Sequence, residues 1–82
     1  MKKPLYETEY QKQQGYCFDG EHKEVVTVLQ SNLGDGWCNP SITYASMSGL
    51  NSDQVVELAN MLKDAAKVMD HWSLASRTEE DA

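Results

Sequence analysis

Residues 50–72, LNSDQVVELANMLKDAAKVMDHW, decide the fold of this chain. Apolar residues recur in this segment at alternating spacings of three and four, namely Val55, Leu58, Leu62, Ala65, Met69 and Trp72. That spacing places them on one face of an α-helix, and such a face must pack against another part of a protein. The sequence therefore predicts an amphipathic helix from Ser52 to about Ala75.

The residues before this helix carry its start signals. The side chain of Asn51 can accept a hydrogen bond from a helical amide, while Gln54 can reach back to the amide of Asn51. These two residues form a capping-box-like pair. Leu50 and Val55 occupy the two positions of a hydrophobic staple, one residue before the cap and four residues after it.

Two segments upstream of the helix are expected to form strands. Residues 25–28, Val-Val-Thr-Val, are a β-branched run that is costly in a helix and favourable in a strand, so we expect Glu24–Ser31 to be extended. The competing interpretation is a helix that is capped by Asp19 and stopped by Gly34. Ser41–Ser48 alternates in the manner of a strand and ends just before the helix.

The first part of the chain, residues 1–18, allows two interpretations. Tyr6, Thr8 and Tyr10 alternate with acidic residues, which fits a half-exposed strand whose aromatic side chains face inward. The alternative is a short helix over Pro4–Gln14 that ends at Gly15. We expect the strand.

These elements predict an α+β protein in which a small antiparallel β-meander of two to three strands packs against the long C-terminal helix. Residues 1–78 are expected to form this single domain, followed by an acidic tail at residues 79–82. The helix would be roughly 33–36 Å long, whereas strands of this length span about 25 Å. Met69 and Trp72 are therefore expected to overhang the sheet and to meet a second chain or the folded-back N-terminus.

Charge restricts the class of partner. The 82 residues include 13 acidic and 7 basic side chains, for a formal net charge of −6, and Glu79, Glu80 and Asp81 supply three of the negative charges. Such a field repels nucleic acid and membrane surfaces and favours a protein partner with a basic surface. We therefore expect no direct nucleic-acid partner and no membrane partner.

The sequence shows neither a membrane anchor nor a secretion signal. No apolar run approaches the roughly 20 residues that span a bilayer, and the basic start Met1–Lys3 lacks an apolar stretch behind it. We expect a soluble, cytoplasmic protein. In that reducing compartment Cys17 and Cys38 are expected to be thiols, and a disulfide between them is the open alternative.

The sequence contains few residues whose type and spacing suit catalysis or metal binding. Its only histidines, His22 and His71, are not spaced with Cys17 and Cys38 as zinc ligands usually are. A metal site that draws on these four residues, or a nucleophilic pair of Cys38 with either histidine, is the alternative that the residue types permit. We expect no catalytic residue, no metal site and no cofactor.

Two groups of residues favour protein binding. At about 100° per residue, Asp53, Glu57 and Asp64 lie on the ridge of the helix opposite its apolar face, where they could meet a basic groove. Asp35 and Trp37 lie in a turn-rich loop, and Trp is enriched at binding hot spots. The Trp37 ring is expected either to plug the underside of this loop or to be displayed as an anchor.

The distal half of the helix offers a third surface. Its apolar residues also fit a heptad pattern, and they broaden the apolar face to about half of the helix circumference. Packing on the sheet is the first expectation for this face. A two-fold dimer is the second, through a candidate dimer face of Met61, Val68, Met69 and Trp72.

The short strands expected at Val25–Leu29 and Ile42–Met47, the helix start Leu50–Gln54 and the acidic tail together define a layout. This layout resembles that of small acidic proteins encoded by bacteriophages and prophages, including anti-CRISPR and other anti-defence inhibitors. The resemblance implies a stoichiometric inhibitor of a host defence or nucleic-acid-binding protein, acting by occlusion of a basic surface or by steric block. The alternative expectation is a homodimeric structural or regulatory accessory subunit without catalytic activity.

Overall fold

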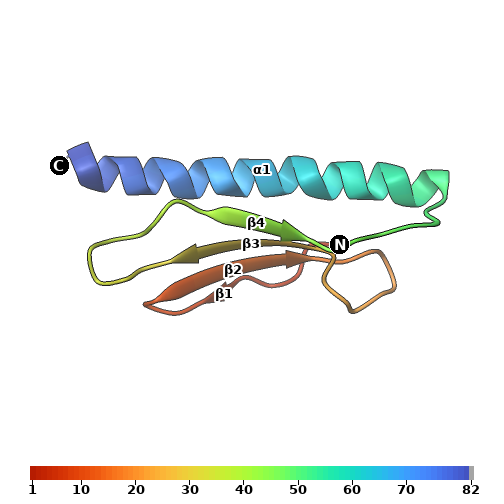
Figure 1. Ribbon diagram of the computed structural model, residues 1–82, viewed down its shortest axis with the longest axis horizontal. Coiled ribbons are helices and arrows are strands. Elements are labelled where there is room, and N and C mark those ends of the chain that lie inside the picture. The colour runs from red at the N-terminus through yellow and green to blue at the C-terminus, as the bar shows by residue number, and fades with distance from the viewer. Residues whose placement is uncertain (82) are drawn as a thin grey trace.

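The computed structural model describes the backbone of residues 1–81 and the side chains of residues 1–73. Within this part of the chain a four-stranded antiparallel sheet lies beside one long helix (Figure 1). The elements are β1 (Tyr6–Glu7), β2 (Gln11–Tyr16), β3 (Val26–Ser31), β4 (Ser41–Tyr44) and α1 (Ser52–Asp81). The strands follow one another in space in the order β1-β2-β3-β4. The predicted α+β meander is confirmed, with four strands in place of two or three.

The N-terminal hairpin differs from its prediction. Only two residues of the expected N-terminal strand, Tyr6–Glu7, form a strand, and the longer strand β2 follows a turn. The Thr8 hydroxyl accepts hydrogen bonds from the amides of Tyr10 and Gln11, at 3.2 and 3.1 Å, and so closes this turn. Tyr6 and Tyr10 are 56% and 68% exposed, so the expected inward aromatic face is wrong.

The strand predicted around residues 25–28 is confirmed as β3, and the helical alternative is excluded. Its side chains alternate between the faces of the sheet, with Val26 and Val28 fully buried and Thr27 partly exposed. The antiparallel register places Tyr16 of β2 opposite Val26 and Ile42 of β4 opposite Val28. These residues therefore share the face of the sheet that packs against α1.

α1 begins at Ser52 with the predicted cap. The Asn51 Oδ1 accepts a hydrogen bond from the Gln54 amide at 2.9 Å, and the Gln54 Oε1 accepts one from the Asn51 amide at 3.0 Å. Two amides at the helix start are satisfied by this reciprocal pair. Leu50 packs against the core, whereas Val55 is 52% exposed, so the other half of the predicted staple lies largely in solvent.

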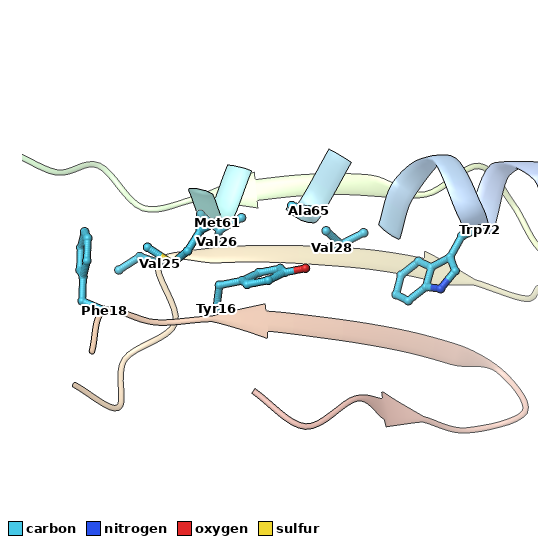
Figure 2. Close-up of a cluster of buried hydrophobic side chains, with 8 residues drawn as sticks. All are labelled: Tyr16, Phe18, Val25, Val26, Val28, Met61, Ala65 and Trp72. Carbon is cyan, nitrogen blue, oxygen red and sulfur yellow. The ribbon is translucent and has the colours of Figure 1, made fainter. Parts of the chain in front are cut away.

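The core lies between α1 and the inner face of the sheet. Figure 2 shows Met61 and Ala65 of the helix next to Val26 and Val28, and the Trp72 ring projecting from the helix towards the sheet. Eight buried residues form this cluster: Tyr16, Phe18, Val25, Val26, Val28, Met61, Ala65 and Trp72. Burying one large apolar side chain stabilises a fold by roughly 1.5–3 kcal/mol, so this cluster and the partly buried residues packed against it stabilise the contact between helix and sheet.

The buried face of α1 is rotated relative to the face that the spacing predicts. Val55 and Leu62 of the predicted stripe are 52% and 40% exposed, whereas Met61, at its margin, is 4% exposed. The centre of the buried face therefore moves by roughly 50° around the helix, at about 100° per residue. The apolar residues of α1 cover more of its circumference than one sheet face can bury, so tertiary packing selects among them.

Trp72 lies over the sheet and does not overhang it. Trp72 is only 7% exposed, and its backbone carbonyl accepts a hydrogen bond from the Gln30 Nε2 of β3 at 3.4 Å. β2 and β3 remain paired as far as Gln11 and Ser31, which extends the sheet beneath the distal part of the helix. No second chain is needed to cover this ring.

The helix is longer than predicted. Its backbone continues past the expected end near Ala75 to Asp81, through a stretch that contains no Gly or Pro. The predicted acidic tail, residues 79–82, lies outside the residues whose side chains are described.

We expect the substitution Asn51→Ala to lower the free energy of unfolding by about 1 kcal/mol, because it leaves one amide of the first helical turn without its acceptor. Urea denaturation followed by far-ultraviolet circular dichroism measures this loss. The matched control is Asn60→Ala, the same substitution at an exposed position within α1, which we expect to be neutral or slightly stabilising. Equal losses in the two variants would contradict the capping role of Asn51.

Candidate functional site

Two of the three carboxylates predicted to form an acidic ridge, Glu57 and Asp64, have partners within their own chain. The rotation of the helix brings Asp64 to the border of the core, on the side of the N-terminal segment. Its Oδ2 accepts a hydrogen bond from the Tyr16 hydroxyl at 2.6 Å and lies 3.5 Å from the Lys2 Nζ. Asp64 therefore already has a donor and a cation within its own chain.

Glu57 also has a hydrogen-bond donor and a cationic group within its own chain. Its Oε2 accepts a hydrogen bond from the Asp19 amide at 2.5 Å and lies 3.9 Å from the amino group of Met1. Glu57 thus ties α1 to the loop after β2 and to the N-terminal segment. Of the three carboxylates predicted to meet a basic partner, Asp53 is the one that is exposed.

The surface beside Asp64 is mixed in charge. A hollow of about 330 Å³ lies between α1 and the N-terminal segment, and Lys2, Lys67 and His71 line it together with Asp64. The positive charges of Lys2 and Lys67 offset the carboxylate locally. This side of the helix is therefore poorly matched to a basic groove.

The contact between Tyr16 and Asp64 moves the pKa values of both groups. The hydrogen bond from Tyr16 lowers the pKa of Asp64 below its ordinary value of 3.8, against the opposing effect of burial, and Lys2 lowers it further. Burial raises the pKa of Tyr16 above its ordinary value of 10.0, and the hydrogen bond and charge of Asp64 add to this effect. The pair is therefore an ionised carboxylate and a neutral phenol at neutral pH.

We expect the contribution of this pair to stability to fall at both extremes of pH. The folded pKa of Asp64 is lowered, so its contribution is complete well above pH 3.8 and is lost as the pH falls through the folded pKa. The folded pKa of Tyr16 is raised, so its contribution is complete below pH 10.0 and is lost as the pH rises towards the folded pKa. Urea denaturation at a series of pH values measures both losses.

The variant Asp64→Asn separates the two effects. It should remove the loss of stability at acidic pH that Asp64 causes. The loss of stability at alkaline pH, which arises from burial of Tyr16, should persist. Asp70→Asn, at an exposed acid on the same helix, is the matched control and should keep the wild-type profile. An unchanged acid-side profile in Asp64→Asn would contradict the assignment.

The loop that carries Asp35 and Trp37 folds back on the end of β3. Trp37 forms an isolated bridge with Asn32, and the Cys38 amide donates a hydrogen bond to the Ser31 carbonyl at 2.8 Å. The Trp37 residue is partly buried, whereas Asp35 is exposed. Trp37 is therefore neither fully inserted under the loop nor fully displayed.

A lysine of β2 joins the two tryptophans. The Lys12 Nζ lies 4.5 Å from the ring centroid of Trp37 and 5.8 Å from that of Trp72. A cation over an aromatic face is attracted by the ring quadrupole. Lys12 therefore connects the loop, the sheet and the distal half of α1.

We expect Lys12→Met to lower the free energy of unfolding by about 0.5–2 kcal/mol, because it keeps the aliphatic stem and removes the charge that faces both rings. Denaturation followed by tryptophan fluorescence measures the change. The control Lys63→Met alters an exposed lysine of α1 and should change stability little. A loss no larger than that of the control would show that the charge of Lys12 does not stabilise the cluster.

The candidate dimer face lies inside the molecule. Met61 and Trp72 are 4% and 7% exposed, and Val68 and Met69 pack against the same core. These residues are therefore engaged by the sheet of their own chain. Exposed apolar residues instead line the flank of α1 opposite Glu57 and Asp64, which we call the apolar flank: Val55, Ala59, Leu62 and Ala66; Val56, which is also exposed, lies on the outer side of the helix.

β4 forms an open edge of the sheet, on the other side of β3 from β2, where Asp64 meets Tyr16. The Ala45 amide donates a hydrogen bond to the Val25 carbonyl at 2.9 Å, so alternate residues of β4 direct their backbone groups towards β3. By the same alternation Ile42 and Tyr44 direct their N–H and C=O groups away from β3. Within residues 1–81 no strand lies beyond β4, and Tyr44 is 73% exposed.

The segment that contains this edge carries no charge. Residues 36–52 include no Asp, Glu, Lys or Arg. Proteins commonly protect an open sheet edge with lysines, prolines or bulges, and here Pro40 before β4 is the one such residue in this segment. We call Ile42, Thr43, Tyr44 and the apolar flank together the edge surface.

The cysteines and histidines considered for chemistry form neither a disulfide nor a cluster of three among the described residues. Cys17 is buried, Cys38 is exposed, and no disulfide joins them. His22 and His71 are exposed. Among the described residues, no three side chains of the metal-ligating types come together in one place.

Comparison with known proteins finds no matching protein family, no matching curated protein and no matching solved structure. Within the described residues, no helix combines the length and the apolar character that crossing a lipid bilayer requires.

The edge surface is the feature that sequence reasoning missed. Its signal was the uncharged run of residues 36–52, which contains an expected strand without a single lysine. The contacts of Lys2 and Lys12 had no comparable signal, because each depends on residues far away in the chain.

Proposed function

We propose that this protein is a small binding module that acts by occupying a surface of another protein in the cytoplasm, without chemistry of its own. The observation that carries the proposal is the edge surface, which presents main-chain donors and acceptors beside exposed apolar side chains. An open strand can bind a partner by adding a strand to the sheet, and the neighbouring side chains then give specificity.

A stoichiometric inhibitor of a host defence or nucleic-acid-binding protein is the first form of this function, and the resemblance to phage-encoded inhibitors supports it. Glu57 and Asp64 already hold internal partners, so fewer carboxylates are available to imitate nucleic acid. Within this proposal we therefore favour steric block over occlusion of a basic surface.

A homodimeric structural or regulatory accessory subunit is the second form. The lack of charge on the edge surface favours it, because two copies of a chain with net charge −6 repel each other except through an uncharged surface. The buried candidate dimer face does not contribute to it.

Capture from a bacterial lysate with a C-terminally tagged chain tests the proposed function. We expect a partner in a near one-to-one ratio that persists at high salt, since an uncharged interface is insensitive to screening. The variant Tyr44→Lys should lose this partner, because it places a charge at the open edge. Quantitative mass spectrometry of the captured proteins measures both effects.

Two further variants show whether the partner binds at the β4 edge or at another surface. Tyr10→Lys makes the same change at a tyrosine that is equally exposed but lies away from β4, and it should keep the partner. Loss of the partner in Asp53→Lys and at high salt would instead favour a charge-dependent inhibitor. Recovery of no other protein, at either salt concentration, would count against the inhibitor and leave the homodimeric form as the one to test.

A further inference from the structure

The open edge of β4 is complementary to itself. Its outward backbone groups belong to Ile42 and Tyr44, on either side of Thr43. When a second β4 approaches antiparallel with Thr43 opposite Thr43, each Ile42 faces a Tyr44, and all outward groups of these residues form hydrogen bonds. A shift of one residue breaks this match, because it sets outward groups against inward ones.

The side chains match in the same register. Tyr44 of one copy would lie beside Ile42 of the other on the face that packs against α1, and the two Thr43 side chains would be neighbours on the opposite face. Aromatic pairs with β-branched residues and Thr–Thr pairs are both favourable across antiparallel strands. The arrangement would cover the exposed ring of Tyr44.

The charge of the molecule restricts how two copies can meet. With a net charge of −6, approach through most surfaces is repulsive, and residues 36–52 provide a segment without charged side chains, although Glu24 lines a hollow together with Thr43 and Tyr44. The four residues of the apolar flank are likewise uncharged. A second copy therefore fits the edge surface better than a charged partner does.

The helices support the same arrangement. A two-fold axis perpendicular to the sheet keeps both α1 helices on one face and turns their apolar flanks towards each other. Three strand spacings separate β3 of one copy from β3 of the other, or roughly 14 Å. A helix with its side chains is about 10–12 Å wide, so the facing flanks lie within side-chain reach.

We propose that two copies of this chain pair through β4, antiparallel and centred on Thr43, to form one eight-stranded sheet that carries both helices on the same face. The inference rests on the proposed binding function and names a second copy as the partner. It replaces the candidate dimer face in the core with the open edge of the sheet.

Two variants with opposite charges at position 43, tested alone and mixed, examine both the pairing and its register. The wild-type chain should show a concentration-dependent monomer–dimer equilibrium in sedimentation equilibrium, with a dissociation constant on the order of micromolar or weaker for so small an interface. Thr43→Lys and Thr43→Glu each place two like charges across the axis, and each should weaken the dimer by up to about fivefold. An equal mixture should form a heterodimer, seen by native mass spectrometry, with affinity near that of the wild type.

Ser31→Lys and Ser31→Glu provide the matched controls, because Ser31 is an exposed small residue of β3 away from the axis. They should leave the dimer unchanged, and circular dichroism should show that all four variants fold. The pairing would be overturned if charges at Thr43 left the dimer affinity unchanged. It would also be overturned if the mixture of Thr43→Lys and Thr43→Glu did not regain an affinity near that of the wild type.

A wild-type chain that stays monomeric up to about 1 mM would also overturn the inference. The capture experiment then distinguishes the two proposals. If Tyr44→Lys still abolishes binding of a different protein, the proposed function stands and the edge receives that protein. If capture is empty as well, both proposals fail.

Discussion

The fit of α1 onto the two buried valines of β3 fixes how the helix is turned about its own axis. Ala65 is fully buried, and its small side chain lets the helix backbone come close to Val26 and Val28 (Figure 2). Met61 and Trp72 then extend this contact along the sheet on either side. A rotation of about 60° in one direction would bring Leu62 to the angular position of Ala65 and overfill the core, and one of about 100° in the other direction would bring Asp64 there and bury a charge.

This rotation gives the two flanks of the helix different roles. On one flank, Glu57 accepts a hydrogen bond from the Asp19 amide in the loop after β2, and Asp64 meets the Tyr16 phenol of β2 and the Lys2 ammonium of the N-terminal segment. These two carboxylates, which the sequence suggests as part of a binding surface, therefore connect α1 to β2, to the loop after β2 and to the N-terminal segment. On the other flank, Val55 and Leu62 stay exposed beside β4.

The sequence predicts each element better than it predicts their mutual orientation. The cap at Asn51 and the β-branched run of β3 depend on neighbours in the chain, so local rules identify both. The turn at Thr8 was missed because alternating tyrosines imitate a strand. The rotation of α1 was missed because its apolar residues cover about half of the circumference, and only the shape of the sheet selects among them.

The proposed edge surface follows from the size of the chain as well as from its packing. A domain of this length buries a smaller share of its apolar surface than a larger one does. Tyr44, Val55 and Leu62 remain in contact with water, at 73%, 52% and 40% exposure, although they surround an open edge that carries no charge. Isolated apolar residues on a surface need no explanation, but their grouping beside outward backbone groups does. A strand added to this edge satisfies the backbone groups and removes the apolar side chains from water in one step, which is why we infer binding there.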